Sequence, residues 1–246
     1  MSETTTARAA ATVILLRPSA PTGFEVFLTR RPEGMRFLGG MYCFPGGGVN
    51  EEDCSPRTIA RCLGVSPPQA RKIIGAQFRP QAALGFWIAA IRELFEEVGI
   101  LLTVGASGTV LSIDAMRKHR LAEKHAALIA KSVSFTELLE SENLYCSASA
   151  LAYFSHWQTP AQNSLRFDTR FFLAVLPPAQ TPSPTSYEVM HSLWLTPDRA
   201  IQLFEHGELP LIFPTFASLR TLADFETLET LFAEFSDRNA MASATR

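Results

Sequence analysis

The sequence predicts an α/β or α+β sandwich, in which strands that look antiparallel are mixed with amphipathic helices along one chain. Short apolar segments bounded by turn residues indicate strands, and longer segments with apolar residues at helical spacing indicate helices. The chain has 246 residues, of which 47% are hydrophobic and 19% charged. This length and composition are typical of a soluble globular protein with a substantial core.

The first third of the chain is expected to begin with a loose tail at residues 1–10 and two strands, 13–17 and 24–30, around a turn. A glycine-rich loop at 39–53 and a segment with short helices at 54–80 are expected to follow. The clearest short helix follows Ser66, which can cap it. Pro67 suits its first position and Gly75 ends it.

In the rest of the chain, helices are expected at residues 81–98, 114–131, 134–141, 197–205 and 215–235. Strands are expected at residues 100–104, 150–157, 166–176 and 188–195. Prolines cluster at 177–184, between two of these strands. The cluster therefore fits an exposed loop better than a linker, and we expect one domain over residues 1–246.

Charge and cysteine content narrow the class of protein. The net charge of −2 gives no reason to expect a nucleic-acid or membrane partner, and no run of about 18 apolar residues predicts a membrane-spanning helix. The four cysteines form no C-x-x-C pair, as expected for reduced thiols in a cytoplasmic protein. The apolar run AAATVILL lacks the flanking features of a signal peptide and is interpreted as a first strand.

The stretch AAIRELFEEVGI breaks two local rules of helix design. Glu93, Glu96 and Glu97 fall on one helical face, where like charges three and four residues apart repel by roughly 0.2–0.5 kcal/mol per pair. They also lie in the last turns before Gly99, where the helix dipole favours cations. Such breaches tend to mark function or strain.

These three acids have two interpretations. One is a metal site, because Mg²⁺ takes oxygen ligands and is commonly shared between carboxylates and the phosphates of a substrate. The backbone of Gly46, Gly47 and Gly48 has no side chain that would keep a phosphate or a metal away. The other interpretation is a solvated acidic face, which is the better one for an arbitrary E-x-x-E-E pattern.

The sequence motif around the three acids favours the metal site. Residues 92–100 read R-E-L-F-E-E-V-G-I and match R-E-U-x-E-E-x-G-U, where U is aliphatic, the second half of the Nudix box. Upstream, residues 44–48 read F-P-G-G-G and resemble the F-P-G-G that opens this box. The chain therefore resembles the Nudix hydrolase superfamily.

One departure from the box is large. Between its first acid and the arginine the usual box has seven residues, and this chain has residues 54–91. The first acid is then Asp53, or it is displaced to Glu51 or Glu52. In the superfamily that acid is mainly a structural partner of the helix, so the resemblance implies that catalysis survives the change.

A box interrupted at this point resembles the Nudix coenzyme A diphosphatases of the mammalian peroxisomal type and related bacterial proteins. The resemblance runs from about residue 12 to residue 222 and includes the stretches LTRRPEGMRFLGGMYCFPGG, HWQTP, RFDTRFFL and FPT. It implies a Nudix α/β/α sandwich with a mixed central sheet, a helical insertion at 54–80 inside the box, and C-terminal helices.

The resemblance also implies a reaction. Mg²⁺ or Mn²⁺ would bind to Glu93, Glu96 and Glu97, with a carbonyl near Gly47 as a further ligand, and Arg92 would orient the acids. The reaction would be hydrolysis of the phosphoanhydride bond in a nucleoside diphosphate linked to another group. For coenzyme A or acyl-CoA the products would be 3′,5′-ADP and a 4′-phosphopantetheine.

The general base is left open between three acids. Glu93 and Glu97 of the box are candidates, and Glu188 is another because it begins a strand just before Trp194. A surface position is an equal interpretation of Glu188.

Candidate substrate contacts surround the glycine loop. Arg30 and Arg31 stand before the loop, where their forked geometry suits phosphates, although a solvated strand end is an alternative. Gly46 and Gly47 would approach the substrate through their backbone.

The inserted segment is expected to be a lid or wall over the metal site, because both of its ends are tethered to that site. Ile73, Ile74 and Phe78 would then bind an acyl or pantetheine arm. A contact in a homodimer is an alternative use for exposed apolar residues.

Two other functions compete with hydrolysis of coenzyme A. Within the same class of enzyme, the substrate would be ADP-ribose or another nucleoside diphosphate derivative. From a different class, the chain would be a Nudix-like binding module without catalysis, although a pure binding module has no need for three repelling acids.

Overall fold

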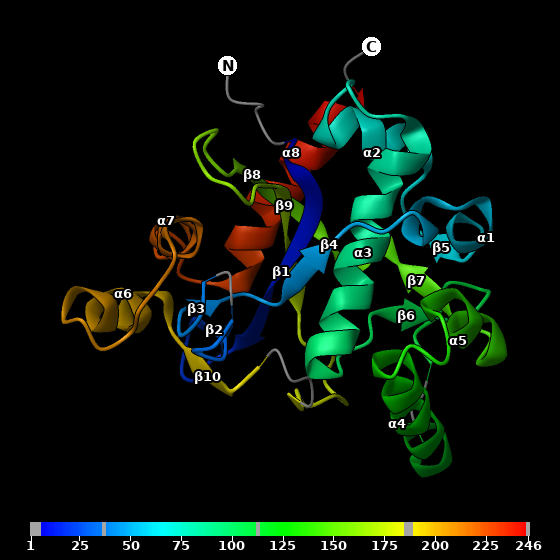
Figure 1. Cartoon of the computed structure of the whole chain (residues 1–246), viewed down its shortest axis with the longest axis horizontal. Coiled ribbons are helices and arrows are strands. Elements are labelled where there is room, and N and C mark those ends of the chain that lie inside the picture. The colour runs from blue at the N-terminus through cyan, green and yellow to red at the C-terminus, as the bar shows by residue number, and fades with distance from the viewer. Residues whose placement is uncertain (1–5, 36–37, 112–113, 185–188, 245–246) are drawn as a thin grey trace.

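The computed structural model describes residues 6–35, 38–111, 114–184 and 189–244. One sheet contains seven strands: β1 (Arg8–Pro18), β2 (Phe24–Arg30), β3 (Tyr42–Cys43), β4 (Gly46–Gly48), β8 (Ala152–Gln158), β9 (Phe167–Val175) and β10 (His191–Leu195). Its central order is β10–β2–β1–β9–β8, with β3 paired to β2 and β4 paired to β1 (Figure 1). β1 is parallel to β9 and the other pairs are antiparallel, so the sheet is mixed, as predicted.

Helices cover both faces of this sheet (Figure 1). α3 (Pro80–Val98) packs on one face, and α6 (Pro197–Glu205), α7 (Phe213–Leu222) and α8 (Leu228–Ala244) lie on the other. The alternation along β1 explains both layers. Val13 and Leu15 belong to the apolar cluster under α3, whereas Ile14 and Leu16 belong to the cluster under α6–α8. The predicted α/β/α sandwich is confirmed.

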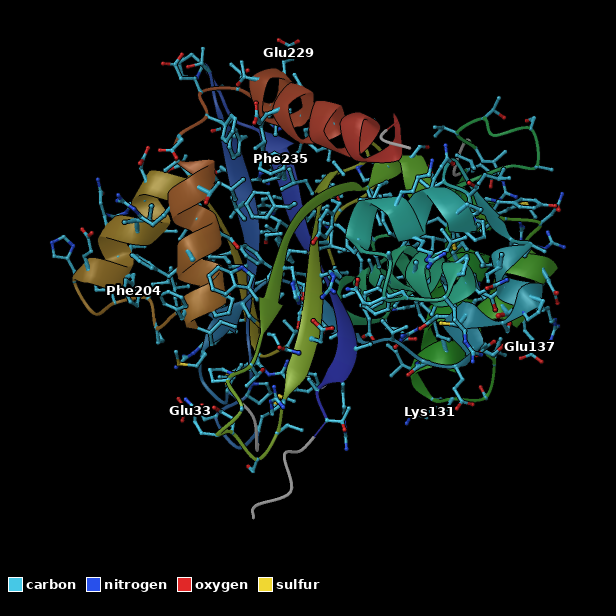
Figure 2. The ribbon with its side chains drawn as sticks, turned by 90° about the horizontal axis from the view of Figure 1, so that it is seen from above. Glu33, Lys131, Glu137, Phe204, Glu229 and Phe235 are labelled. Carbon is cyan, nitrogen blue, oxygen red and sulfur yellow. The ribbon has the colours of Figure 1, made fainter. Side chains whose placement is uncertain are left out.

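α8 closes the second face through aromatic contacts. Figure 2 shows Phe235 on the side of α8 that faces the sheet and Glu229 on the opposite side. The ring of Phe235 lies 4.7 Å from that of Phe154 on β8, centroid to centroid. Burial of large aromatic side chains of this kind stabilises the packing of a helix on a sheet.

A smaller three-stranded sheet and four helices lie beyond α3. The strands are β5 (Cys62–Leu63), β6 (Thr103–Val104) and β7 (Tyr145–Ser147), in the order β5–β7–β6, and the helices are α1 (Pro56–Ile59), α2 (Pro67–Ile74), α4 (Ala115–Ile129) and α5 (Phe135–Ser141). The inserted segment thus forms α1, β5 and α2. α2 begins with the predicted cap at Ser66, reinforced by Gln69, and ends before Gly75.

Three sequence-based boundaries are wrong. Residues 8–10 are not a tail but the start of β1, where Ala10 pairs with β9 on one side and with β4 on the other. In the expected strand 100–104 only the last two residues pair, because Leu101 exchanges both backbone hydrogen bonds with the Gln180 amide. The expected helix 215–235 breaks after α7, since the Thr227 hydroxyl accepts the backbone N–H of Thr230 and caps α8.

Gly85 lets the start of the insertion pack on α3. A Cβ at this position would overlap with Sγ of Cys54. We therefore expect Gly85→Ala to destabilise the fold by about 1–3 kcal/mol, the usual cost of overpacking, although alanine is the better helix former by about 1 kcal/mol. Urea unfolding measures the change.

The control is the same substitution in a Cys54→Ala protein, where the overlapping sulfur is absent. There Gly85→Ala should be neutral or stabilising. Equal destabilisation in both backgrounds would show that the sulfur is not the obstacle.

Candidate active site

The acidic helix and the glycine loop face each other, as the sequence predicted. α3 starts with Pro80 at its first position and ends at Gly99, whose φ of 72° is the left-handed geometry of a glycine C-cap. Its buried stripe fixes the helix against β1 and β4. The last two turns, which carry the acids, therefore lie against the loop that contains β4.

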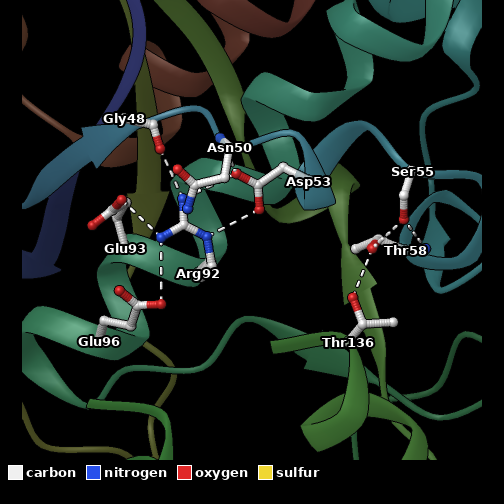
Figure 3. A network of polar contacts seen from close by, with 9 residues as sticks. All are labelled: Gly48, Asn50, Asp53, Ser55, Thr58, Arg92, Glu93, Glu96 and Thr136. Carbon is white, nitrogen blue, oxygen red and sulfur yellow. Dashed lines mark hydrogen bonds and ion pairs between the residues drawn. The ribbon is translucent and has the colours of Figure 1, made fainter. Parts of the chain in front are cut away.

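Arg92 is the centre of a buried polar network (Figure 3). Its guanidinium donates to both carboxylate oxygens of Asp53 at 2.9 and 3.0 Å, and to the carbonyl of Gly48 at 2.8 Å. It also donates to Glu93 at 2.8 Å and to Glu96 at 3.3 Å. One side chain thus connects the helix to the last glycine of the loop and to the acid that follows it.

The network identifies the acid that pairs with the helix. The side chains of Asp53 and Arg92 are only 2% and 6% exposed, and Asp53 also accepts the backbone N–H of Asn50 at 2.8 Å. Glu51 and Glu52 are exposed. Spacing alone left these three acids as alternatives, and the short 3₁₀ turn Glu52–Cys54 directs the third one inward.

The glycines bring the loop within reach of the acids. The backbone N–H of Gly46 donates to Oε2 of Glu97 at 3.1 Å. A Cβ on Gly47 would lie 2.6 Å from the carboxylate carbon of Glu93, so no other residue fits there without displacing that acid. Glycine at these two positions therefore lets the loop approach the acids closely, and their expected contact with a substrate stays a prediction.

Burial and the charges of neighbouring residues change the pKa of the Glu93 carboxyl. Burial, together with the charges of Glu96 and Asp53, raises its pKa to about 7, against the lowering effect of Arg92. Three carboxylates, those of Asp53, Glu93 and Glu96, thus surround one guanidinium, and a further cation would relieve the remaining repulsion.

A cavity of about 540 Å³ opens beside the acids. It is lined by Asn50, Glu52, Arg92, Glu93, Glu96, Glu97, Leu128, Ile129, Lys131, Ser132, Val133, Ser134, Phe135 and Glu137. Its second side is therefore formed by the turn between α4 and α5. Sequence reasoning missed this turn, because it carries no motif and lies far from the box along the chain.

The inserted segment is not the expected lid over the cavity. None of residues 54–80 lines it. Ile74 is buried in the main core, and Ile73 and Phe78 pack against that core, with the Phe78 ring 5.2 Å from that of Phe86. The expected arm-binding residues are thus core residues, because α2 packs on the first half of α3, away from the acids.

The acids fit a divalent cation by their chemistry. Within the described ranges, no three His, Cys, Asp or Glu side chains already converge as a ligand cluster. Glu93 is held by Arg92, and Glu97 by Gly46. Together with Glu96 they line one cavity, and carboxylate oxygens are the donors that Mg²⁺ prefers.

The other predicted site residues have different positions. Arg30 donates to the carbonyl of Gly40 at 3.1 Å and pairs with Glu33 at 3.3 Å, outside the cavity lining. Arg31 hydrogen-bonds to Cys43, whose thiol also lies in the field of Glu97. Glu188 lies outside the described residues.

A further contact connects α4 to the acidic helix. The Nε2–H of His125 donates to the carbonyl of Glu96 at 3.1 Å, and its ring lies 4.7 Å from that of Phe95. No spacing pattern in the sequence indicated this histidine.

Comparison with known proteins identifies the family. The family model described as the NUDT19 Nudix domain matches residues 4–222. The chain belongs to the Nudix hydrolase family. It is therefore a hydrolase, as predicted, and members of this family generally use divalent metal ions. Residues 44–48 and 92–100 are its Nudix box.

Individual relatives agree with this assignment. This Nudix hydrolase is 30% identical to "Acyl-coenzyme A diphosphatase NUDT19" of Gallus gallus, over 90% of this chain and 67% of that protein. It is 28% identical to the protein of the same name from Homo sapiens, over 87% of this chain and 64% of that protein. The chain thus spans about two thirds of the length of these relatives.

A solved structure supports the fold. The crystal structure of a NUDIX hydrolase from Alicyclobacillus acidocaldarius has a TM-score of 0.74 and 28% sequence identity, and the match covers 93% of this chain and 96% of that one. Among the described residues of this Nudix hydrolase, no helix combines the length and apolarity needed to cross a membrane.

The Arg92–Asp53 pair predicts a large effect of one substitution. Asp53→Asn should lower the free energy of unfolding by about 1–3 kcal/mol, because it removes the carboxylate that accepts two hydrogen bonds from the buried guanidinium and turns an amide N–H toward one of its donors. Chemical denaturation measures this.

Glu51→Gln is the matched control, since Glu51 is exposed two residues away. It should change stability by no more than about 0.5 kcal/mol. Similar losses for both variants would contradict the assignment of Asp53 as the partner of Arg92.

The raised pKa of Glu93 predicts a pH dependence of stability in chelator. Between pH 4.5 and about 7 the folded carboxyl keeps a proton that the unfolded one has lost, so this group destabilises the fold as the pH rises. Glu93→Gln removes that cost. The difference in unfolding free energy between Glu93→Gln and wild type should therefore shift in favour of the variant by up to about 3 kcal/mol as the pH rises from 4.5 to about 7.

Denaturation at several pH values measures the difference between the two proteins. Glu51→Gln, a change at an exposed glutamate, should differ from wild type by the same small amount at every pH. A pH-independent difference for Glu93→Gln would contradict the raised pKa.

Proposed function

We propose that this Nudix hydrolase uses Mg²⁺ or Mn²⁺ to cleave the phosphoanhydride bond of coenzyme A or acyl-CoA. The products are 3′,5′-ADP and 4′-phosphopantetheine or its acyl derivative. The observation that carries the proposal is the convergence of Glu93, Glu96 and Glu97 on one cavity, where Arg92 holds the first two and the backbone of Gly46 holds the third. The names of the relatives, acyl-coenzyme A diphosphatases, supply the class of substrate.

In this proposal Glu93, Glu96 and Glu97 hold the metal, together with the backbone carbonyl of Gly47. The bound cation neutralises charge on the diphosphate and lowers the pKa of the attacking water. Arg92 is a positioning residue, since its guanidinium is already engaged by Asp53 and by the acids that it orients. Glycines in the loop let the substrate phosphates approach the backbone.

Two acids of the described site are candidates for the general base. Glu93 has a pKa near 7 without metal, which suits a group that accepts a proton at neutral pH. Glu97 is held by the backbone of Gly46 and lines the same cavity. Glu188 stays a candidate outside the described residues.

The two arginines before the loop have different support as phosphate contacts. Arg31 interacts with the thiol of Cys43, just before the glycine loop, and is our candidate for a substrate phosphate. Arg30 is engaged with Gly40 and Glu33, and it supports the turn before the loop instead.

The test of this function is release of 3′,5′-ADP from coenzyme A and acetyl-CoA, with ADP-ribose in parallel, in Mg²⁺, in Mn²⁺ and in chelator. We expect turnover of the coenzyme A substrates to exceed that of ADP-ribose and to stop in chelator. Preference for ADP-ribose would keep the metal chemistry and overturn the substrate.

Glu97→Gln separates catalysis from mere binding in the same assay. It keeps an acceptor for Gly46 and removes one negative ligand or base. Turnover should fall by about 10² or more, while the unfolding midpoint stays close to that of wild type. Glu123→Gln on α4 is the matched control. An active Glu97→Gln protein would overturn the proposed role of the box acids.

A further inference from the structure

The side of the cavity opposite the acids is built from one turn. We call the cavity-lining residues of segment 128–137 the facing wall; they are Leu128, Ile129, Lys131, Ser132, Val133, Ser134, Phe135 and Glu137. Figure 2 shows Lys131 and Glu137 at the periphery, on the opposite side of the molecule from Phe204 of α6. The facing wall is thus open to solvent on one side and to the acids on the other.

The turn that carries Lys131 has a defined backbone. Lys131 has a φ of 56°, in the left-handed region that side chains other than glycine and asparagine rarely adopt. Its N–H donates to the carbonyl of Leu128 at 2.9 Å, and both the N–H and the hydroxyl of Ser132 donate to Ala127 at 3.0 Å. Unfavourable backbone geometry of this kind is concentrated at functional positions.

Contacts behind the facing wall fix it relative to the acids. His125 ties α4 to the carbonyl of Glu96. The hydroxyls of Thr58 and Thr136 are 2.7 Å apart in the buried contact between the insertion and α5 (Figure 3). Arg57 forms an ion pair with Glu140 beside it. The insertion therefore supports the facing wall from behind.

Charge distinguishes Lys131 from the other lining residues. The cavity lining holds five glutamates and two cations, Arg92 and Lys131. Arg92 already forms ion pairs with Asp53, Glu93 and Glu96. Lys131 is exposed, and within the described part of the chain no carboxylate pairs with it. Its ammonium is therefore available to a ligand in the cavity.

We propose that Lys131 binds a phosphate group of the substrate, and that the facing wall thereby contributes to substrate specificity. The proposal rests on the proposed function for its choice of coenzyme A as substrate. A metal on the acids and a cation on the opposite side would together balance a polyanionic nucleotide. The phosphate is either the diphosphate or the 3′-phosphate of the nucleotide, and the two are separated by experiment.

Lys131→Met tests the contact, because methionine keeps an unbranched side chain and removes the charge. KM for coenzyme A should rise at least about fivefold, the scale of a lost charge-assisted contact, with kcat little changed. Dephospho-coenzyme A, which lacks the 3′-phosphate, is assayed in parallel. A rise for both substrates identifies the diphosphate, and a rise for coenzyme A alone identifies the 3′-phosphate.

Two controls accompany this variant. Lys118→Met changes an exposed lysine of α4 outside the cavity lining, and its KM should equal that of wild type. Lys131→Arg keeps the charge and should recover most of the affinity. If KM for both substrates is the same in Lys131→Met and wild type, the proposal is overturned.

Binding measurements separate this proposal from the proposed function. Coenzyme A, 3′,5′-ADP and inorganic pyrophosphate are titrated calorimetrically, with Mg²⁺, into Glu97→Gln and into the Glu97→Gln, Lys131→Met double variant. Absence of coenzyme A turnover in wild type would overturn the function alone. Weaker binding of any of the three ligands to the double variant supports Lys131, whereas equal affinities, or no binding to either protein, overturn it.

Discussion

The geometry of the site depends on one buried guanidinium. Arg92 is nearly inaccessible to solvent, and a charge in that position persists only when its donors are satisfied. Asp53 and Gly48 take the donors on the loop side, and Glu93 and Glu96 take those on the helix side. Because these partners come from both halves of an interrupted box, the same interaction that neutralises the arginine also holds the halves together.

The position of Asp53 explains how the box tolerates an insertion. The chain makes its contact with Arg92 at Asp53 and only then departs into residues 54–80. It returns at Pro80, more than three helical turns before the acids, where α2 and the start of α3 pack together. The inserted residues between these points do not line the cavity beside the acids. They contact α5 and so support the α4–α5 turn instead.

Local signals in the sequence were sufficient to predict the helices and strands. They were not sufficient to predict which segments lie next to each other in the fold. The cap at Ser66, the apolar strand segment 24–30 and the glycine at the end of α3 are each specified within a few residues, and the structure has them as expected. Choosing Asp53 over Glu51 required knowing which side chain points inward. The facing wall was harder still to predict, because it lines the same cavity as the acids without sharing any sequence pattern with them.

Lys131 and Glu93 depart from stable design in related ways. Lys131 has a backbone conformation that glycine would adopt at lower cost, and Glu93 retains a carboxylate where burial opposes its charge. The left-handed backbone at Lys131 closes the end of α4, but glycine would do this at lower cost, and an uncharged side chain at position 93 would avoid the burial of a carboxylate. The two residues lie on opposite sides of one cavity, one a source of positive charge and the other a site for a cation. The metal-bound polyphosphate that we propose as ligand would use both of them, the carboxylate through the metal and the ammonium directly.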